Sequence, residues 1–380
     1  MKVLLVHNYY RQDSIGGEDV VFRNELEGLK SMLGEENVFV FTKYNDRASL
    51  IRVLSGMFFS LSAFFKVLYT IISCRIDIVH VHNTFPLISP SVFIAARIMK
   101  TPSVLTLHNF RLNCIAGTLY RNSYGVCEDC VVKSSQLPAI KYKCFRGSTI
   151  QSMGAAIALS FHQKLKLYNY VDYFFVLTKF QRRKLMDMGY DEDKLLWKPN
   201  FIAEYECSMA LESDYFDFLY VGRLEEPKGI LDVLQIWRDS DIPYSLGVIG
   251  IATKELDLPV HENITYLGKM NNKNVLDYMN RCKYVLQPSL LYETFGLTIL
   301  EAMSTGTPVV GYDIGTRSEF IEDGTNGFLV SVHKLQKGLD RAMGFKDYSR
   351  LVECARSTAW EYRQRRILAE QIELYSNIIR

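Results

Sequence analysis

Two glutamates, Glu293 and Glu301, flank a glycine-containing segment that follows a predicted strand at Tyr284–Gln287. We expect a helix to begin at Thr294 or Phe295, and the free N–H groups at a helix start bind phosphate oxygens. Eight residues advance an α-helix by about 12 Å, so the two carboxylates can reach opposite ends of one elongated ligand. Because carboxylates accept hydrogen bonds from sugar hydroxyls, the pattern predicts a ribose at one end, a hexose at the other and a diphosphate between them.

A second loop, Gly222-Arg223-Leu224-Glu225-Glu226-Pro227-Lys228-Gly229, carries paired positive charge after a predicted strand at Phe216–Val221. A glycine lets a phosphate approach the backbone, and Arg and Lys side chains neutralise phosphate without a metal ion. The loop therefore favours a diphosphate site. For this stretch alone, the alternative is a βα loop with incidental basic residues.

Four cysteines, Cys114, Cys127, Cys130 and Cys144, lie in one polar, irregular insertion at 111–147. Four thiolates with one close pair can hold a structural zinc ion in tetrahedral geometry. A loop of this length inside a compact domain usually needs such a clip or has a function of its own. Structural zinc, free thiols and a disulfide all remain open, and a reducing compartment argues against the disulfide.

The elements that position these residues must belong to more than one domain. The chain has 380 residues, too many for one ordinary α/β core and enough for two. Lys and Arg exceed Asp and Glu by only two, so no overall field selects nucleic acid as a partner. The start of the chain, Met1–His7, is a predicted strand without the flanks of a secretory signal, which predicts a cytoplasmic location.

Predicted strands and helices alternate along the chain, which indicates parallel sheets covered by helices. In the first half the predicted strands are Lys2–His7, Val38–Phe41, Ile78–His82, Val104–His108 and Tyr173–Leu177. In the second half they are Phe216–Val221, Ser245–Ile249, Ile264–Leu267, Tyr284–Gln287, Val309–Val310 and Phe328–Val330. We predict an α/β fold with two Rossmann-like, doubly wound domains, which bind ligands at the carboxyl ends of their strands.

The domain boundary is expected at Lys198-Pro199-Asn200, because an acidic, irregular stretch follows. We assign residues 1–199 to a first domain that includes the insertion 111–147. Residues 200–355 form a second domain with both ligand loops, and residues 356–380 a C-terminal helix expected to pack back toward the first domain.

One segment, Val53–Ser73, is long and apolar enough to suggest a membrane span, with Lys66 as its only charge. Glycine and serine residues dilute it, and a span there would interrupt the first sheet. We therefore predict a buried or surface-lying helix. An interfacial helix whose aromatic residues enter lipid is one form of it.

In combination, these motifs resemble glycosyltransferase family four, the retaining family with the GT-B fold, in which two Rossmann-like domains face each other across a cleft. The Glu-x7-Glu pair of the family corresponds to Glu293 and Glu301. Its phosphate loop corresponds to residues 222–229 and its Gly-x-Pro-Val-Val strand to residues 306–310. The resemblance extends over nearly the whole chain and is specific mainly in the second half.

The first domain matches the family in part. Gly16-Gly17-Glu18 corresponds to a Gly-Gly-x-Glu loop, but Asp19 stands where Glu is usual. His108 corresponds to a histidine that faces the donor sugar, and Asn109 follows it where Asp is usual. A similar Cys-Glu-Asp-Cys insertion occurs in a subset of family-four enzymes of bacterial surface-polysaccharide pathways.

The resemblance implies a role for each matched residue. Arg223 and Lys228 would neutralise the donor diphosphate, Glu301 would bind the ribose and Glu293 the donor sugar, which makes His108, Glu293, Arg223 and Lys228 the catalytic set. Further donor contacts are expected from Gly16, Gly17, Gly222, Phe295, Gly296 and Leu297. Residues 191–193 and 239–241 match the Asp-x-Asp pattern of a metal motif. We interpret both as polar connecting stretches. We expect no catalytic metal.

The implied enzyme is a retaining hexosyltransferase that moves a sugar from a nucleotide-diphospho-sugar to a glycan or polyprenyl-diphosphate-linked acceptor. We expect the enzyme to act in surface polysaccharide biosynthesis, of exopolysaccharide or lipopolysaccharide. Its expected location is the inner face of the cell membrane, with peripheral contact through residues 53–73. The alternative is a catalytically inactive GT-B subunit of a polysaccharide assembly complex. A dinucleotide oxidoreductase is disfavoured, because no Gly-x-Gly-x-x-Gly follows the first strand.

Overall fold

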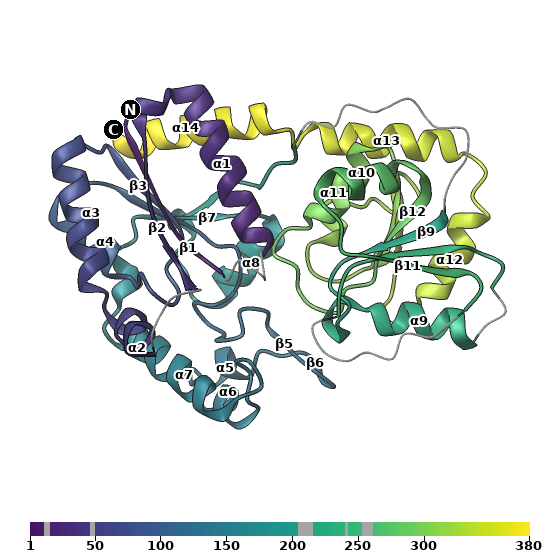
Figure 1. Ribbon diagram of the computed structural model, residues 1–380, viewed down its shortest axis with the longest axis horizontal. Coiled ribbons are helices and arrows are strands. Elements are labelled where there is room, and N and C mark those ends of the chain that lie inside the picture. Colours follow the sequence, from purple (N-terminus) through teal and green to yellow (C-terminus); the bar gives the residue numbers. More distant parts are fainter. Residues whose placement is uncertain (11–15, 46–49, 204–215, 240–241, 253–260) are drawn as a thin grey trace. The chain divides into compact units, whose positions relative to one another are not determined.

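The computed structural model describes residues 1–10, 16–45, 50–203, 216–239, 242–252 and 261–380, and it divides into two compact units (Figure 1). The first unit comprises Met1–Thr118, Glu128–Asn200 and Arg365–Arg380. The second comprises Leu119–Cys127 and Phe201–Gln364. Apart from the short segment Leu119–Cys127, the chain enters the second unit after Asn200 and returns to the first unit for its final helix.

A six-stranded parallel sheet in the order β2-β1-β3-β4-β7-β8 forms the centre of the first unit. Its strands are β1 (Val3–Tyr9), β2 (Val38–Tyr44), β3 (Ile78–Asn83), β4 (Ser103–Thr106), β7 (Tyr173–Val176) and β8 (Leu195–Trp197). Strands β1, β3 and β4 are buried along their whole length, which explains their continuous apolar runs.

Helices surround this sheet. They are α1 (Gly17–Leu33), α2 (Leu50–Phe58), α3 (Leu61–Cys74), α4 (Ser91–Ile98), α5 (Asp129–Val132), α6 (Leu137–Lys141), α7 (Thr149–Lys164), α8 (Lys179–Asp187) and α14 (Gln364–Ile379). The apolar faces of α3 and α4 join the core formed by β1, β3 and β4, with Val67 and Val92 fully buried among strand residues such as Val79.

The apolar segment 53–73 forms two helices rather than one. The first, α2, ends at Phe58, and Ser60 caps α3 by accepting a hydrogen bond from the Ala63 amide. Helix α3 buries one face and exposes Phe65 on the other, so it lies on the unit as predicted. In the described part of the chain, no helix has the length and apolarity that crossing a membrane requires.

The second unit repeats the architecture with the strand order β11-β10-β9-β12-β13-β14, again parallel. The strands are β9 (Phe216–Val221), β10 (Leu246–Ile249), β11 (Ile264–Gly268), β12 (Cys282–Gln287), β13 (Val309–Tyr312) and β14 (Gly327–Val330). Helices α9 (Ile230–Asp239), α10 (Asn272–Asn280), α11 (Leu297–Ser304), α12 (Leu335–Met343) and α13 (Tyr348–Trp360) cover it. The predicted C-terminal helix at 356–380 is thus divided, because its first residues belong to α13 and the rest to α14.

A short hairpin from the cysteine insertion, β5 (Tyr120–Arg121) and β6 (Gly125–Val126), groups with the second unit. The Ser123 amide and the Tyr120 hydroxyl both donate to Oε1 of Glu226, at 2.6 and 3.1 Å. The hairpin therefore supports the loop after β9.

The strand order places a topological switch point in each sheet. In the second unit the chain proceeds in opposite directions from the neighbouring strands β9 and β12, and in the first unit from β1 and β3. Ligands of doubly wound folds bind at such points. Both predicted ligand loops, after β9 and after β12, start at the switch point of the second unit.

Gly229 joins these two loops. Its φ is 73°, and a Cβ there would lie 1.9 Å from the carbonyl oxygen of Pro288. Leu290 also donates its amide to the Pro227 carbonyl at 2.9 Å. Only glycine allows this close approach of the loop backbones.

We expect Gly229→Ala to lower the free energy of unfolding by at least about 2 kcal/mol, because it combines an unfavourable φ with a backbone clash. Gly268→Ala is the matched control, since Gly268 has a φ of 71° and an added Cβ there would meet no atom within 4 Å. Urea unfolding of both variants measures the difference, and equal losses would show that the contact with Pro288 contributes nothing.

Candidate active site

The loops after β9 and β12 meet through an ion pair. Lys228, in the short 3-10 helix η5 (Glu226–Lys228), places Nζ 2.6 Å from Oε1 of Glu293. Ser289 donates its hydroxyl to the same oxygen at 2.8 Å. Burial alone would raise the pKa of Glu293, but Lys228 and Arg317 lower it to about 2. Glu293 is therefore an ionised acceptor at neutral pH.

Arg317, which the sequence motifs did not single out, supports this pair from beneath. It is fully buried, and its guanidinium donates to the carbonyl oxygens of Ile314 and Ser289, each at 2.6 Å. Burial lowers the pKa of Arg317 to about 10 against the opposing effect of Glu293, so the side chain stays charged at neutral pH. Its position just after the turn that follows β13 was the available signal, because that turn lies at the carboxyl edge of the sheet.

Glu301 lies in the second turn of α11, which begins after Gly296. Gly296 has a φ of 141°, a conformation that favours glycine. Asn272 donates to Oε1 of Glu301 at 3.3 Å, and burial raises the pKa of Glu301. Phe295 is a core residue packed on Phe320 at a ring distance of 5.1 Å, so its contribution to a ligand is limited to its backbone.

The remaining predicted residues of the phosphate loop have separate positions. Arg223 is 61% exposed, and its Nη1 lies 3.1 Å from Oε1 of Glu225. The carbonyl of Gly222 lies against Gly250, where a Cβ would come within 1.9 Å. The structure thus brings Lys228 and Glu293 into direct contact and leaves the Arg223 side chain directed to solvent. Their roles as ligand contacts remain predictions.

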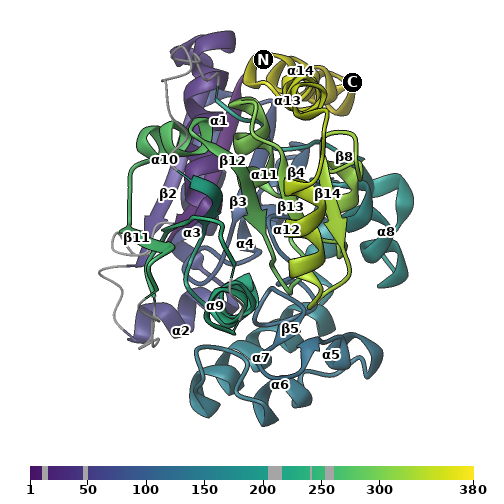
Figure 2. The same cartoon turned by 90° about the vertical axis from the view of Figure 1, so that its right-hand side faces the viewer.

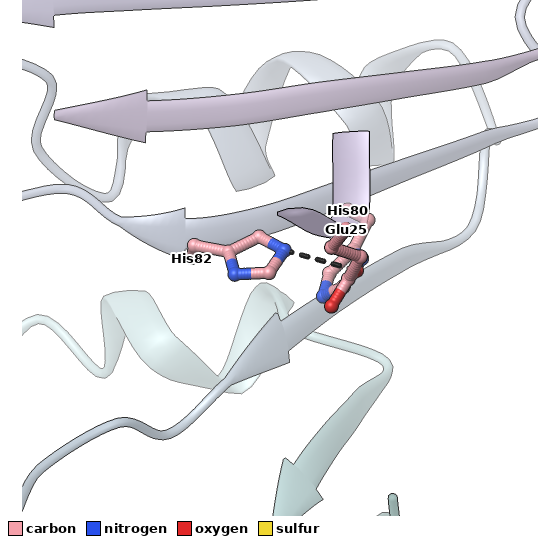
Figure 3. A group of neighbouring side chains, drawn as sticks. All are labelled: Glu25, His80 and His82. Carbon is pink, nitrogen blue, oxygen red and sulfur yellow. Dashed lines mark hydrogen bonds and ion pairs between the residues drawn. The ribbon is translucent and has the colours of Figure 1, made fainter. Parts of the chain in front are cut away.

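In the first unit, His108 joins a buried hydrogen-bonded network. Its Nε2 lies 2.9 Å from Nδ1 of His82 in β3, and the two rings stack. Nε2 of His82 lies 3.2 Å from Oε1 of Glu25 in α1 (Figure 3). The other oxygen of Glu25 lies 2.5 Å from Nζ of Lys198. From α14, Gln371 donates to Oε1 at 2.6 Å.

This network sets the tautomer of His108. Burial lowers the pKa of His82 to about 3 and the pKa of His108 well below its usual range, so both rings are neutral. Burial would raise the pKa of Glu25, but Lys198 and His82 hold it well below its usual range. The ionised carboxylate can only accept, so His82 carries its proton on Nε2 and accepts at Nδ1. His108 must then donate from Nε2, which makes its Nδ1 an acceptor.

Glu25, His80 and His82 form the one group of three metal-ligating side chains that the described residues bring within 4.8 Å (Figure 3). The ammonium of Lys198 already binds the Glu25 carboxylate, so a divalent cation there would lie beside a buried positive charge. We interpret the group as a hydrogen-bonded network. Within the same described residues, the thiols of Cys114, Cys127, Cys130 and Cys144 are not gathered into a metal site, and zinc binding by the insertion stays a prediction.

Glu18, His82, His108, Asn109 and Arg111 are among the residues that line a cavity in the first unit. Asn109 and Tyr10 donate to Oε2 of Glu18, at 3.3 and 3.2 Å. The amide of Asn109 can donate where the Asp usual in family four cannot. Burial raises the pKa of Glu18 to about 7, against the opposing effect of Arg111. Sequence reasoning named Glu18 only as part of a glycine motif.

The neighbours of Glu18 have structural roles. Gly16 is the N-cap of α1 and Gly17 its first residue. Asp19, where the family has Glu, is buried and lies 2.8 Å from Nε2 of His7 in β1. The carboxylate next to the cavity therefore comes from Glu18 rather than from Asp19.

The fold and these sites define a class, the GT-B fold of glycosyltransferases, and solved structures confirm the prediction. The Anabaena protein Alr3699/HepE in complex with UDP is 16% identical, with a TM-score of 0.67 over 99% of this chain and 100% of that chain. The lipopolysaccharide outer core galactosyltransferase WaaB is 15% identical, with a TM-score of 0.62 over the same shares.

Residues 204–353 match the family described as Glycosyl transferases group 1. The match covers 150 of the 380 residues, all in the second half of the chain. A relative from Klebsiella pneumoniae, "Uncharacterized 41.2 kDa protein in cps region", is 30% identical over 129 residues. That match covers 33% of this chain and 36% of the relative, so the aligned part spans about a third of each.

Glu18 should make stability depend on pH. Because the pKa of Glu18 is raised in the folded state, its protonated carboxyl contributes to folding stability below about pH 4.5. This contribution is lost as the pH rises through about 7. Glu18→Gln should remove this dependence and gain roughly 1–2 kcal/mol over wild type between pH 5 and pH 8, with allowance for the partial exposure of the side chain. Urea titrations across this range measure it. The exposed Glu27→Gln in the same helix is the control, and an unchanged slope in Glu18→Gln would contradict the assignment.

The tautomer of His108 is directly observable. In protein with ¹⁵N-labelled imidazoles, the His108 signals should show a proton on Nε2 alone. His82→Phe should release this constraint and give a mixture of tautomers, while His162→Gln, a change at another buried histidine of the same unit, should leave the His108 pattern unchanged. A wild-type His108 that is protonated on Nδ1 would refute the network as described.

Proposed function

We propose that the protein is a retaining glycosyltransferase that uses a nucleotide-diphospho-sugar donor. The observation that carries this proposal is the Lys228–Glu293 ion pair at the switch point of the second sheet, next to the start of α11. A helix start, a lysine and an ionised glutamate at such a point offer partners for a diphosphate and for sugar hydroxyls. The UDP complex of the Anabaena protein supports the choice of donor class.

Each residue then has a defined task in this proposal. Lys228 and Arg223 neutralise the diphosphate, and the amides of Gly296 and Leu297 bind its oxygens. Glu301 accepts hydrogen bonds from the ribose. Glu293 accepts them from the donor sugar, because a carboxylate with a pKa of about 2 stays ionised and cannot serve as a general acid. His108, with Nδ1 as an acceptor, contacts a hydroxyl of the donor sugar.

The proposed transfer needs no protein nucleophile. The bond between the anomeric carbon and the diphosphate oxygen breaks, and the acceptor oxygen forms a new bond to that carbon on the same face. The proton of the acceptor hydroxyl passes to the leaving diphosphate. The protein contributes positive charge where negative charge develops, and it holds the two reactants in position. No metal or other cofactor is part of this proposal.

For the acceptor, we propose a glycan or a polyprenyl-diphosphate-linked glycan of surface polysaccharide biosynthesis, at the inner face of the cell membrane. The Klebsiella relative in a cps region and the likeness to WaaB support this setting. Peripheral contact through 53–73 is part of the proposal. Helix α3 supports it, because it exposes Leu61, Phe65 and Ile72 on one face.

An inactive GT-B binding subunit is the second candidate. The ion pair between Lys228 and Glu293 disfavours it, because a binding subunit has no need of a lysine and an ionised glutamate together at the donor position. The two candidates differ in whether a nucleotide-sugar binds.

We expect one member of a panel of UDP-, GDP- and ADP-sugars to raise the melting temperature of wild type, with the shift retained in EDTA. Glu301→Ala should abolish the shift by removing the ribose acceptor, whereas Glu353→Ala, an exposed carboxylate in α13, should keep it. Thermal unfolding over a series of ligand concentrations gives the affinity of each variant. If no nucleotide-sugar stabilises wild type, the binding-subunit alternative takes precedence.

A further inference from the structure

The stretch between Asp129 and Asp172 contains no acidic residue. It carries six basic residues, Lys133, Lys141, Lys143, Arg146, Lys164 and Lys166. In the whole chain, 44 Lys and Arg residues are balanced by 42 Asp and Glu residues, so this charge segregation is local. The proposed donor site uses none of these six residues, which all belong to the first unit.

This stretch folds into one block of helices, α5, α6 and α7. Helix α6 packs on both α5 and α7, and the three lie together at one end of the first unit in both views (Figures 1 and 2). The inner face of α7 is buried, where Ala155 and Leu159 pack with Met57 of α2 and Ala139 of α6. The block is thus anchored to the unit through one side of α7.

The outer side of α7 is apolar as well. Ile150, Met153, Ile157, Phe161 and Leu165 recur at every third or fourth position, which places them on one face of the helix. Each is between 36% and 78% exposed. Scattered exposed apolar residues are ordinary, but a continuous apolar stripe along a helix marks an interaction surface. Val132 in α5 and Leu137 in α6, which precede α7 in the sequence, are exposed as well.

The six basic side chains are all exposed. Lys133 follows α5, Lys141 ends α6, and Lys143 and Arg146 lie in the connection to α7. Lys164 ends α7, and Lys166 lies two residues beyond it. Cations are therefore present at both ends of the apolar stripe. An apolar helix face with flanking Lys and Arg is the pattern of helices that lie in the interface of an anionic bilayer.

Other occupants fit this surface less well. A second copy of the same face would bring six cations against six, which electrostatic repulsion disfavours. A soluble acidic glycan would pair with the basic residues but would leave the isoleucine and phenylalanine side chains without a partner. A bilayer of anionic phospholipid satisfies the charges and the apolar stripe together.

We propose that the outer face of the α5–α7 block docks on the surface of an anionic phospholipid bilayer, with the α7 stripe inserted among the lipid chains. This site is formed by other residues than the 53–73 segment but adjoins it, because Phe161 of the stripe packs on Phe58 at a ring distance of 5.6 Å. It deepens the proposed function by giving the enzyme a place at the membrane that holds a lipid-linked acceptor, and it is independent of donor binding.

Flotation with liposomes tests this proposal on the full chain. Wild type should float with vesicles of phosphatidylcholine and phosphatidylglycerol and stay in the dense fraction with phosphatidylcholine alone. Replacing Ile150, Ile157 and Leu165 together by Ser should abolish flotation. Replacing Lys141, Lys143 and Arg146 together by Gln should weaken binding by on the order of 100-fold, and added salt should mimic this loss. A matched variant of α3, with Leu61, Phe65 and Ile72 changed to Ser, should lose less.

Three outcomes would overturn the proposal: wild type that does not float, an α7 variant that floats like wild type, or loss confined to the α3 variant. Loss in the basic variant together with full binding by the α7 variant would identify a purely electrostatic contact and would likewise refute insertion. The melting temperature of each variant and its stabilisation by the donor are recorded in parallel. An intact donor response without flotation rejects the docking surface alone, while flotation without a donor response rejects the proposed enzyme alone.

Discussion

The first unit depends on one buried carboxylate. Glu25 lies inside the protein with no exposed surface, and a charge in that position is tolerated only where cations and donors surround it. Lys198 provides the cation, while His82 and Gln371 donate hydrogen bonds. His82 lies in β3, Lys198 directly follows β8, and Gln371 lies in α14. This single charge therefore links parts of the chain that are far apart in sequence. His108 acquires its tautomer from the same arrangement.

The second unit also contains a glutamate paired with a lysine, but this pair is less buried. Its Lys228–Glu293 pair is also short and hydrogen-bonded, but both side chains keep part of their surface exposed to solvent. Arg317 lies fully buried behind the pair and fixes the loop backbone through two carbonyl oxygens. The inner pair of the first unit is closed off from solvent, whereas the outer pair of the second remains accessible to it. The parallel sheets, with switch points at β1–β3 and β9–β12, bring both pairs to the carboxyl edges of strands.

The sequence predicted the sites in which chemistry is encoded by nearby residues. Glu293, Glu301 and Lys228 could be found because each follows a buried strand in a short motif. The strand positions in both sheets followed from apolar runs except at β8, which was not predicted. Glu25, Lys198 and Arg317 could not be found this way, because their partners are brought together by tertiary packing. The helices at 53–73 and at the C-terminus were each predicted as one. In the structure, Ser60 caps α3 and so separates it from α2. A turn between Trp360 and Gln364 separates α13 from α14.

The return of α14 to the first unit has a consequence for how the chain matures. Gln371 and Tyr375, which complete the buried network, are synthesised after every segment of the second unit, which ends at Gln364. Until they emerge, the first unit lacks one donor to Glu25, the Gln371 amide, and the Tyr375 ring that packs on Phe175. The first unit is therefore incomplete at the stage when all segments of the second unit are already available. The unit whose synthesis begins first is thus the last to receive all of its segments.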